Sequence, residues 1–192
     1  MICLTKKTEY VITNMVASAS LGLELDLYSL ASKIPEIEYE PEQFPGAILK
    51  FKEPTKASLL LFKNGKVVCV GCKRRDLIDK TIQKTIKMLT PYAKRITKTK
   101  KPKIEITNIV ASANLHLELD LYKIAYKLKD VEYEPEQFPG AILKFRDPKA
   151  SLLLFKNGKV ICAGAKSEDE IKQALAKAKK LLKPYAEKVK RR

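Results

Sequence analysis

Few residues of this chain have the types and spacing that chemistry requires. The cysteines are Cys3, Cys69, Cys72 and Cys162. Cys69 and Cys72 have the spacing of a redox or zinc pair, but they lie in an apolar run and no second pair completes a metal site. We therefore expect Cys69 and Cys162 to be buried structural residues of a reduced, intracellular protein.

No other catalytic constellation is evident in the sequence. His116 is the only histidine. We find no Cys–His pairing, no paired-carboxylate motif and no phosphate-binding glycine loop. We expect His116 to be a surface or inter-element residue, because Gly22 occupies the corresponding place in the first copy of a repeat described below. The sequence predicts a protein that is not an enzyme, with no cofactor and no metal.

The charge of the chain points to a polyanionic partner. Its formal net charge is +16 at pH 7, and such an excess attracts nucleic acid. The alternative is a lysine-rich solvated surface of the kind found in heat-adapted proteins. No apolar run approaches the ~20 residues that span a bilayer, and the amino terminus lacks a signal peptide. We expect no membrane partner and a cytoplasmic location, or a nuclear one if the source is eukaryotic.

The elements that must position any site are duplicated. Glu38 to Phe51 reads EYEPEQFPGAILKF, and Glu132 to Phe145 repeats it without a change. Lys56 to Val67 reads KASLLLFKNGKV, and Lys149 to Val160 repeats that as well. A period this long indicates two fused copies of a small fold rather than a solenoid. We place the copies at residues 1–96 and 104–192, joined by a polar linker at 97–103.

Each copy shows the same order of predicted elements. Strand propensity and hairpin signals predict strands over Tyr10–Ser18, Ala47–Phe51, Ala57–Phe62 and Lys66–Val70. Asp26 and its counterpart Asp120 are candidate caps of a short helix. A long helix closes each copy. Ser167 begins a capping box in the second copy, and Asp76 is the expected cap in the first, where Arg74 replaces the serine.

The strands are apolar on both faces. Leu59–Phe62 and Val67–Val70 are apolar at successive positions, whereas antiparallel strands usually alternate because one face meets water. Two helices per copy can cover only one face of a sheet. The second apolar face therefore indicates a binding surface.

The duplicated EPEQFPGAIL and LLLFKNGKV motifs, with G-x-K after the last strand, closely resemble the core of TATA-binding proteins. The match runs from about Glu9 to Tyr185. The resemblance implies an α+β fold: a two-fold repeated saddle with a curved ten-stranded antiparallel sheet and four helices on its convex face. It also implies a general transcription initiation factor that binds the minor groove of A·T-rich TATA-box DNA and bends it. The family is a standard example of minor-groove insertion and kinking.

The resemblance assigns roles to particular residues. Four phenylalanines become wedges between base steps, although most phenylalanines are core residues: Phe44, Phe62, Phe138 and Phe155. Asn14 and Asn108 match the family's central hydrogen-bonding asparagines, since an amide can donate to A N3 and T O2. The apolar residues that match positions on sugars and base edges are Val16, Val110, Leu60, Leu153, Val68 and Ile161.

Basic residues match phosphate-contacting positions of the family, with free surface lysines as the alternative: Lys50, Lys66, Lys73, Lys144, Lys159 and Lys166. Asn64 and Asn157 are additional candidates for phosphate or sugar contacts. One departure concerns the last strand, where Val70 and Ala163 replace the usual threonine. We expect weaker reading of the central base pairs as a result, with an unchanged binding mode.

The implied partners are promoter DNA, transcription factor B and, indirectly, RNA polymerase. The expected contacts for transcription factor B are Glu134, Glu136 and Gln137, because acidic residues suit a basic partner surface. A weak homodimer in the absence of DNA is a further expectation. The chain looks more like archaeal than eukaryotic members of the family. Two alternatives remain open: a DNA-recognition module of a glycosylase-like repair system, and a nucleic-acid- or protein-binding scaffold of the same fold.

Overall fold

The computed structural model describes residues 8–52, 56–97 and 102–186. Cys3 and most of the predicted linker lie outside this part of the chain. Two compact units are present: one comprises Asn14–Thr107, and the other combines Met1–Thr13 with Asn108–Arg192. Within the described residues, no helix is long and apolar enough to cross a membrane.

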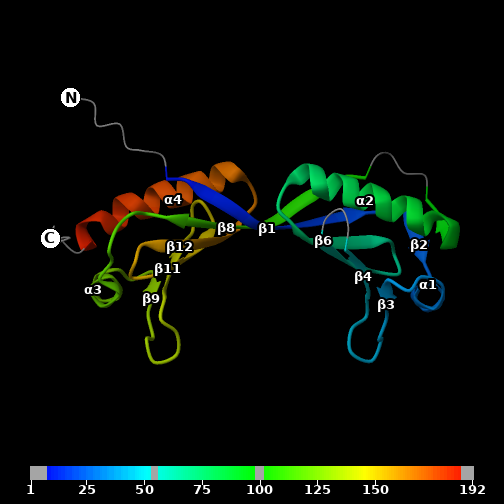
Figure 1. Cartoon of the computed structure of the whole chain (residues 1–192), viewed down its shortest axis with the longest axis horizontal. Helices are drawn as coiled ribbons and strands as arrows, with labels where there is room; N and C mark the ends of the chain where they lie inside the picture. Colours follow the sequence, from blue (N-terminus) through cyan, green and yellow to red (C-terminus); the bar gives the residue numbers. More distant parts are fainter. Residues whose placement is uncertain (1–7, 53–55, 98–101, 187–192) are drawn as a thin grey trace. The chain divides into compact units, whose positions relative to one another are not determined.

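The first half of the chain forms these elements: β1 (Tyr10–Ser20), β2 (Leu23–Leu25), α1 (Leu27–Lys33), β3 (Ile37–Glu38), β4 (Ala47–Phe51), β5 (Ala57–Leu61), β6 (Lys66–Cys72), α2 (Arg75–Leu89), the 3-10 turn η1 (Thr90–Tyr92) and β7 (Ala93–Ile96). The second half follows the same order with these elements: β8 (Glu105–Asn114), α3 (Leu121–Lys127), β9 (Val131–Glu132), β10 (Ala141–Phe145), β11 (Ala150–Leu154), β12 (Lys159–Ala165), α4 (Glu168–Leu182) and η2 (Lys183–Tyr185). A single antiparallel bridge between Leu119 and Ala186 stands at the place of the β2–β7 pair. Figure 1 shows both sets.

The sheet topology confirms the predicted fold class. The strand order of the ten-stranded sheet is β3-β4-β5-β6-β1-β8-β12-β11-β10-β9, and β2 pairs with β7 in a separate two-stranded sheet. Neighbouring strands run antiparallel, as in the β4–β5 and β10–β11 hairpins. The protein is therefore an α+β protein with a two-fold repeat of strands and helices.

Strands β1 and β8 each belong to both compact units. The first residues of β1 group with the second copy, where the Thr13 hydroxyl donates to the Val110 carbonyl at 3.1 Å. The first residues of β8 group with the first copy, where the Thr107 hydroxyl donates to the Val16 carbonyl at 3.2 Å. The boundaries of the compact units therefore differ from those of the sequence repeats, because the first residues of β1 and of β8 each pack with the other copy.

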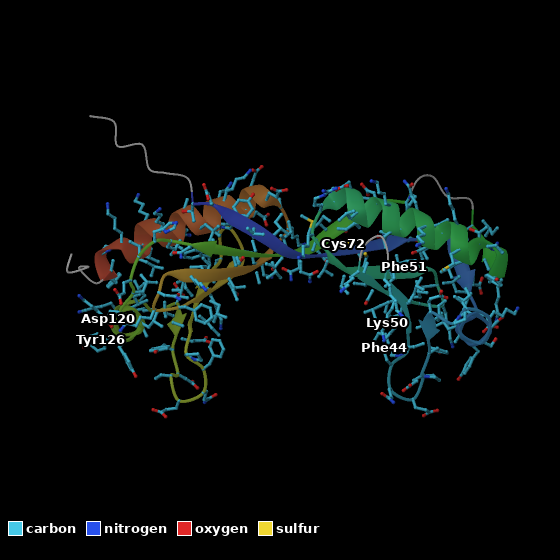
Figure 2. All side chains as sticks on the ribbon, viewed as in Figure 1. Phe44, Lys50, Phe51, Cys72, Asp120 and Tyr126 are labelled. Atoms are coloured by element: carbon cyan, nitrogen blue, oxygen red, sulfur yellow. The ribbon has the colours of Figure 1, made fainter. Side chains whose placement is uncertain are left out.

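Burial alternates along β4, β5, β10 and β11 and along β6 and β12 up to their bulges, so each sheet half has two different faces. Leu59 and Leu61 of β5 are fully buried, while Leu60 between them is half-buried. Each long helix lies against the buried side of its own unit, α2 against β6 and α4 against β11 and β12 (Figure 1). In Figure 2, Phe51 and Cys72 lie near α2, whereas Phe44 lies farther from that helix. Two helices thus bury one apolar face and leave the other accessible.

The short helices begin where the sequence predicts. Asp26 caps α1 by accepting a hydrogen bond from the Ser29 backbone N–H at 3.2 Å. This bond, together with Lys94, lowers the pKa of the Asp26 carboxyl. Asp120 caps α3 in the same way, accepting from the Lys123 N–H at 3.0 Å.

The long helices differ in their caps. Ser167 caps α4 by accepting from the Glu170 N–H at 3.2 Å, while Glu170 accepts from the Lys166 N–H at 2.7 Å. The prediction of Asp76 as the cap of α2 is wrong. Arg74 occupies the N-cap without a side-chain hydrogen bond. Asp76 lies inside the first turn and instead pairs with the Arg74 guanidinium, which lowers the pKa of its carboxyl.

This difference predicts opposite effects of two substitutions. We expect Ser167→Ala to lower the free energy of unfolding by about 1 kcal/mol, because a helix N–H loses its partner. We expect Arg74→Ser to raise it by a similar amount, about 1 kcal/mol, because the new hydroxyl supplies the missing cap. Denaturant unfolding measures both. Arg74→Ala is the control that removes the exposed ion pair without adding a cap, and an equal gain from both Arg74 variants would contradict the prediction.

Candidate nucleic-acid interface

The accessible face of the first sheet half is an apolar row that crosses four strands. Ile48 pairs with Leu60, Leu60 pairs with Val68, and Val68 pairs with Ser18. All four side chains are half-buried. Val16 of β1 lies on the same face, two residues before Ser18. Side chains that keep this much exposure on a sheet face offer an apolar binding surface.

The second sheet half carries the same row. Ile142 pairs with Leu153, Leu153 pairs with Ile161, and Ile161 pairs with Ser112. Ile161 is 38% exposed, which is high for a strand residue with strand neighbours on both sides. Val110 of β8 is half-buried on this face. The predicted apolar positions therefore share one surface within each unit.

The four candidate wedges form two pairs at the ends of these rows. The ring centroids of Phe44 and Phe62 are 6.0 Å apart with an interplanar angle of 63°. Phe138 and Phe155 repeat this edge-to-face arrangement at 6.1 Å and 62°. None of the four is buried, and Phe138 is 43% exposed. The core uses Phe51 and Phe145 instead, each beneath a lysine ammonium 4.7 Å from its ring centroid.

A glycine lets each pair of rings lie against the backbone. A Cβ atom on Gly46 would meet a Phe44 ring carbon at 2.7 Å and a Phe62 ring carbon at 3.2 Å. A Cβ on Gly140 would meet the Phe138 ring at 2.8 Å. The contacts at 2.7 and 2.8 Å would force the first ring of each pair to shift, and the 3.2 Å contact is tighter than ordinary van der Waals contact. The Gln-Phe-Pro-Gly sequence thus holds the first ring of each pair beside the second.

The two candidate asparagines are oriented by a bulge in the last strand of each unit. The Asn14 Oδ1 accepts a hydrogen bond from the Gly71 N–H at 2.8 Å, and the Asn108 Oδ1 accepts from Gly164 at 2.7 Å. Both glycines have a φ of +95°, which disfavours other residues. Because the amide oxygen already accepts a hydrogen bond, the Nδ2 group of each asparagine is the part of the side chain that is available to bind a ligand. The site therefore presents donors.

The six candidate lysines are exposed, but two of them are paired. Lys50 forms an ion pair with Glu38 at 2.7 Å, and Lys144 pairs with Glu132 at 2.6 Å. Such exposed pairs contribute little and exchange readily for a phosphate. Within the described part of the chain, the structure shows no ion pair for Lys66, Lys73, Lys159 or Lys166. Asn64 and Asn157 have a local role, since each Oδ1 accepts the backbone N–H of the lysine two residues on.

Sequence reasoning missed several residues of this face. Ser58 pairs with both Lys50 and Val70, so it lies beside the position where the family's threonine is replaced. Ser151 pairs with Lys144 and Ala163 in the second unit. The missed residues are Ile48, Ser18, Ser58, Ile142, Ser112 and Ser151. Strand alternation was the signal that could have identified them, because each shares its parity with an assigned neighbour.

The first unit also has a groove beside its aromatic pair. Its volume is about 510 Å³, and its lining includes Phe62, Val68, Lys66, Lys103 and Glu105. Apolar and basic side chains meet in this groove.

The acidic loops project from the same units. Glu134, Glu136 and Gln137 are exposed in a turn in which the Gln137 N–H donates to the Glu134 carbonyl at 3.0 Å. In the first copy, Gln43 donates to the Glu40 carboxylate. The loops therefore present carboxylates next to the wedge phenylalanines.

The thiols and the histidine contribute no chemistry to this face. Cys69 and Cys162 are fully buried, as predicted. Cys72 is buried too, with its Sγ 3.9 Å from that of Cys69. Within the described residues, no group of three or more metal-ligating side chains occurs. His116 is exposed with a φ of 56°, at the place where Gly22 stands in the first copy.

These features define a class of protein in which two copies of an α+β unit share one antiparallel sheet with an accessible apolar face. The family model described as "Transcription factor TFIID (or TATA-binding protein, TBP)" matches residues 9–92 and 103–185. The chain therefore belongs to the TATA-binding protein family, as its motifs predicted.

Several archaeal TATA-box-binding proteins resemble the chain over most of its length. The TATA-box-binding protein of Pyrobaculum calidifontis is 42% identical over 93% of this chain and 88% of its own. The TATA-box-binding protein of Picrophilus torridus is 46% identical over 92% of this chain and 96% of its own. The solved structure of Methanococcus jannaschii TBP has a TM-score of 0.83 and 41% identity, and covers 92% of this chain and 99% of that one.

The buried thiols predict slow chemical modification. Burial raises the pKa of the Cys69 thiol to about 12 and that of Cys162 to about 11. A thiol with a pKa near 12 is ionised in about one molecule in ten thousand at pH 8. We expect a Cys3→Ser variant to react slowly with a disulfide reagent when native, and at all three remaining thiols in guanidinium. A rapid reaction of the native protein would contradict this.

Proposed function

We propose that this protein is a general transcription initiation factor that grips the minor groove of A·T-rich promoter DNA and bends it. The observation that carries the proposal is the pair of edge-to-face phenylalanines beside each apolar row. Phe51 and Phe145 are buried in the core, whereas the four paired rings remain partly exposed. Exposed aromatic rings of this kind are suited to contact with a partner. Wedge side chains partly unstack base steps and kink the duplex, and TATA-binding proteins are a standard example.

The face between the wedges supplies the base preference. An A·T pair presents only acceptors in the minor groove, whereas a G·C pair adds the protruding N2 amine of guanine. Leu60, Val68 and their counterparts Leu153 and Ile161 leave no acceptor for that amine and little room for it. Asn14 and Asn108 supply donors. The resulting preference is for A·T pairs in either order, and Val70 and Ala163 supply no hydroxyl to strengthen it.

The lysines provide the affinity that does not depend on sequence. Lys66 and Lys159 begin the last strand of each unit, and Lys73 and Lys166 follow it. We propose that these four, together with Lys50 and Lys144, contact phosphates. Each neutralised phosphate releases counterions, which makes binding salt-dependent.

The acidic loop of the second copy recruits transcription factor B, and through it RNA polymerase. Glu134, Glu136 and Gln137 suit a basic partner surface. Bound DNA and this factor together form the promoter complex, and the protein performs no catalysis itself.

The wedges are tested by Phe44→Ala and Phe138→Ala, singly and together. Unstacking a step costs a few kcal/mol and is recovered only when a ring fills the gap. We expect the double variant to bind an A·T-rich duplex about tenfold or more weakly and to bend it less, as measured by energy transfer between dyes at the duplex ends. Tyr28→Ala, which removes an exposed ring from α1, is the matched control.

Thermal melting separates the two readings of these rings. Since neither ring belongs to the buried core, the variants should melt close to the parent protein. If the variants bend DNA as much as the parent protein does, the wedge mechanism is wrong. If the variants unfold, Phe44 and Phe138 are core residues instead.

The lysines predict a specific salt dependence. Log K falls by about 0.9 per log unit of salt for each neutralised phosphate. We expect Lys66→Ala with Lys159→Ala to flatten the slope by roughly 2 and to weaken all sequences about equally. Lys80→Ala with Lys180→Ala removes the same charge from exposed positions of α2 and α4 and should leave the slope unchanged. If both double variants flattened the salt slope equally, Lys66 and Lys159 would have no specific role in phosphate contact.

A further inference from the structure

The two copies present the same loop to a partner. Residues 38–51 and 132–145 are identical, and their wedge pairs have the same geometry. The acceptors of an A·T minor groove are also nearly two-fold symmetric. A partner that contacted the acidic loop alone could not distinguish one end of the protein from the other. The selecting feature must lie near the loop and differ between the copies.

The short helix beside each loop meets both conditions. Helices α1 and α3 have equal lengths and equivalent aspartate caps. Their residues outside the buried core differ: Lys123 stands where the first copy has Ser29, and Tyr126 stands where it has Ser32. The first helix therefore offers hydroxyls at positions where the second offers an ammonium and an aromatic ring.

Helix α3 is joined to the loop by an aromatic contact. The rings of Tyr122 and Tyr133 pack edge to face, with centroids 5.1 Å apart. Tyr133 immediately precedes Glu134, so the aromatic surface of α3 continues into the acidic loop. The first copy has the same link, with Tyr28 and Tyr39 at 5.0 Å. The link is thus common to both ends, and the difference lies one helical turn beyond it.

Tyr126 enlarges this surface in the second copy alone. It follows Tyr122 by one turn, and the two rings are 84% and 68% exposed. The Lys127 ammonium lies 5.3 Å from the Tyr126 ring centroid, whereas its counterpart Lys33 lies over Tyr92 at 5.8 Å. Figure 2 labels Tyr126 on α3 with the cap Asp120. Tyrosine is one of the residues enriched among the anchors of protein–protein interfaces, and Lys123 and Lys127 add positive charge beside the two rings.

We propose that the α3 surface, formed by Tyr122, Lys123, Tyr126 and Lys127, selects the end of the protein at which its protein partner docks. The partner must present a basic patch to Glu134 and Glu136 and, beside it, carboxylates and apolar surface to α3. A basic patch alone would fit both ends, while the adjoining acidic and apolar patch fits only the second. The inference rests on the proposed recruitment of transcription factor B.

The test exchanges the two helix surfaces. Lys123→Ser with Tyr126→Ser gives α3 the residues of α1, and Ser29→Lys with Ser32→Tyr gives α1 those of α3. Lys123, Tyr126 and Ser32 are exposed and Ser29 is half-buried, so neither exchange touches the buried residues of the two helices, which are Leu27, Leu30, Leu121 and Ile124. A DNA-cleaving probe on a cysteine at exposed position 156, in a Cys3→Ser background, reports the direction of binding on an A·T-rich site. Each protein is measured with and without transcription factor B.

The parent protein should bind in both directions alone and in one direction with the factor. We expect the Lys123→Ser, Tyr126→Ser variant to lose that bias and to recruit the factor about tenfold more weakly, as for the loss of an interface anchor. Adding the reciprocal exchange should reverse the direction of cleavage. A variant that keeps the parent's bias overturns the inference, and so does a change of direction in the absence of the factor, which would assign α3 to flanking DNA.

Failure of the proposed function looks different. If the factor gives the parent protein no bias and no added protection of DNA, recruitment itself is wrong. If recruitment is normal and sensitive to Glu134→Arg with Glu136→Arg, yet indifferent to the helix exchange, only the α3 inference fails.

Discussion

Both faces of each sheet half are apolar, and the two helices of a unit can bury only one of them. Removing apolar side chains from water is the main favourable term of folding, and here that term is satisfied on the helix side by residues such as Leu59, Leu61 and Cys69. Leu60 and Val68 lie in the same strands with the opposite parity and remain half-buried. The accessible row, the aromatic pairs and the groove all follow from this surplus of apolar surface.

Backbone details then determine what the accessible face can do. Gly46 and Gly140 leave room for a phenylalanine ring that a Cβ atom would displace. Gly71 and Gly164 place an N–H where it engages the oxygen of an asparagine amide. The functional side chains are therefore positioned by neighbours that have no side chain of their own. The placement of Phe44 and Asn14 thus depends on these glycines.

The duplication gives the protein two similar copies, which differ at particular positions. The sheet residues and acidic loops are almost unchanged between copies, whereas the exposed faces of α1 and α3 differ in charge and aromatic content. Buried positions must still fit the core: Cys72, beside Cys69, is matched by a smaller buried residue, Ala165. Exposed helix positions carry no such constraint, so differences that distinguish the ends accumulate there.

The sequence by itself determined the repeat, the family, the four main strands of each copy and three of the four helix caps, because each depends on residues close together in the chain. The short strands β2, β3 and β7 were not predicted from it. The sequence placed Phe44 and Phe62 as a pair only through the family resemblance. Tertiary structure alone decided which end of the Asn14 amide faces outward, that Arg74 rather than Asp76 precedes α2, and that β1 and β8 exchange their beginnings. Each of these depends on where a neighbouring strand or turn places a backbone donor or acceptor. A local sequence pattern cannot predict where that donor or acceptor lies, because partners such as Asn14 and Gly71 are far apart in the chain and meet only when the sheet has formed.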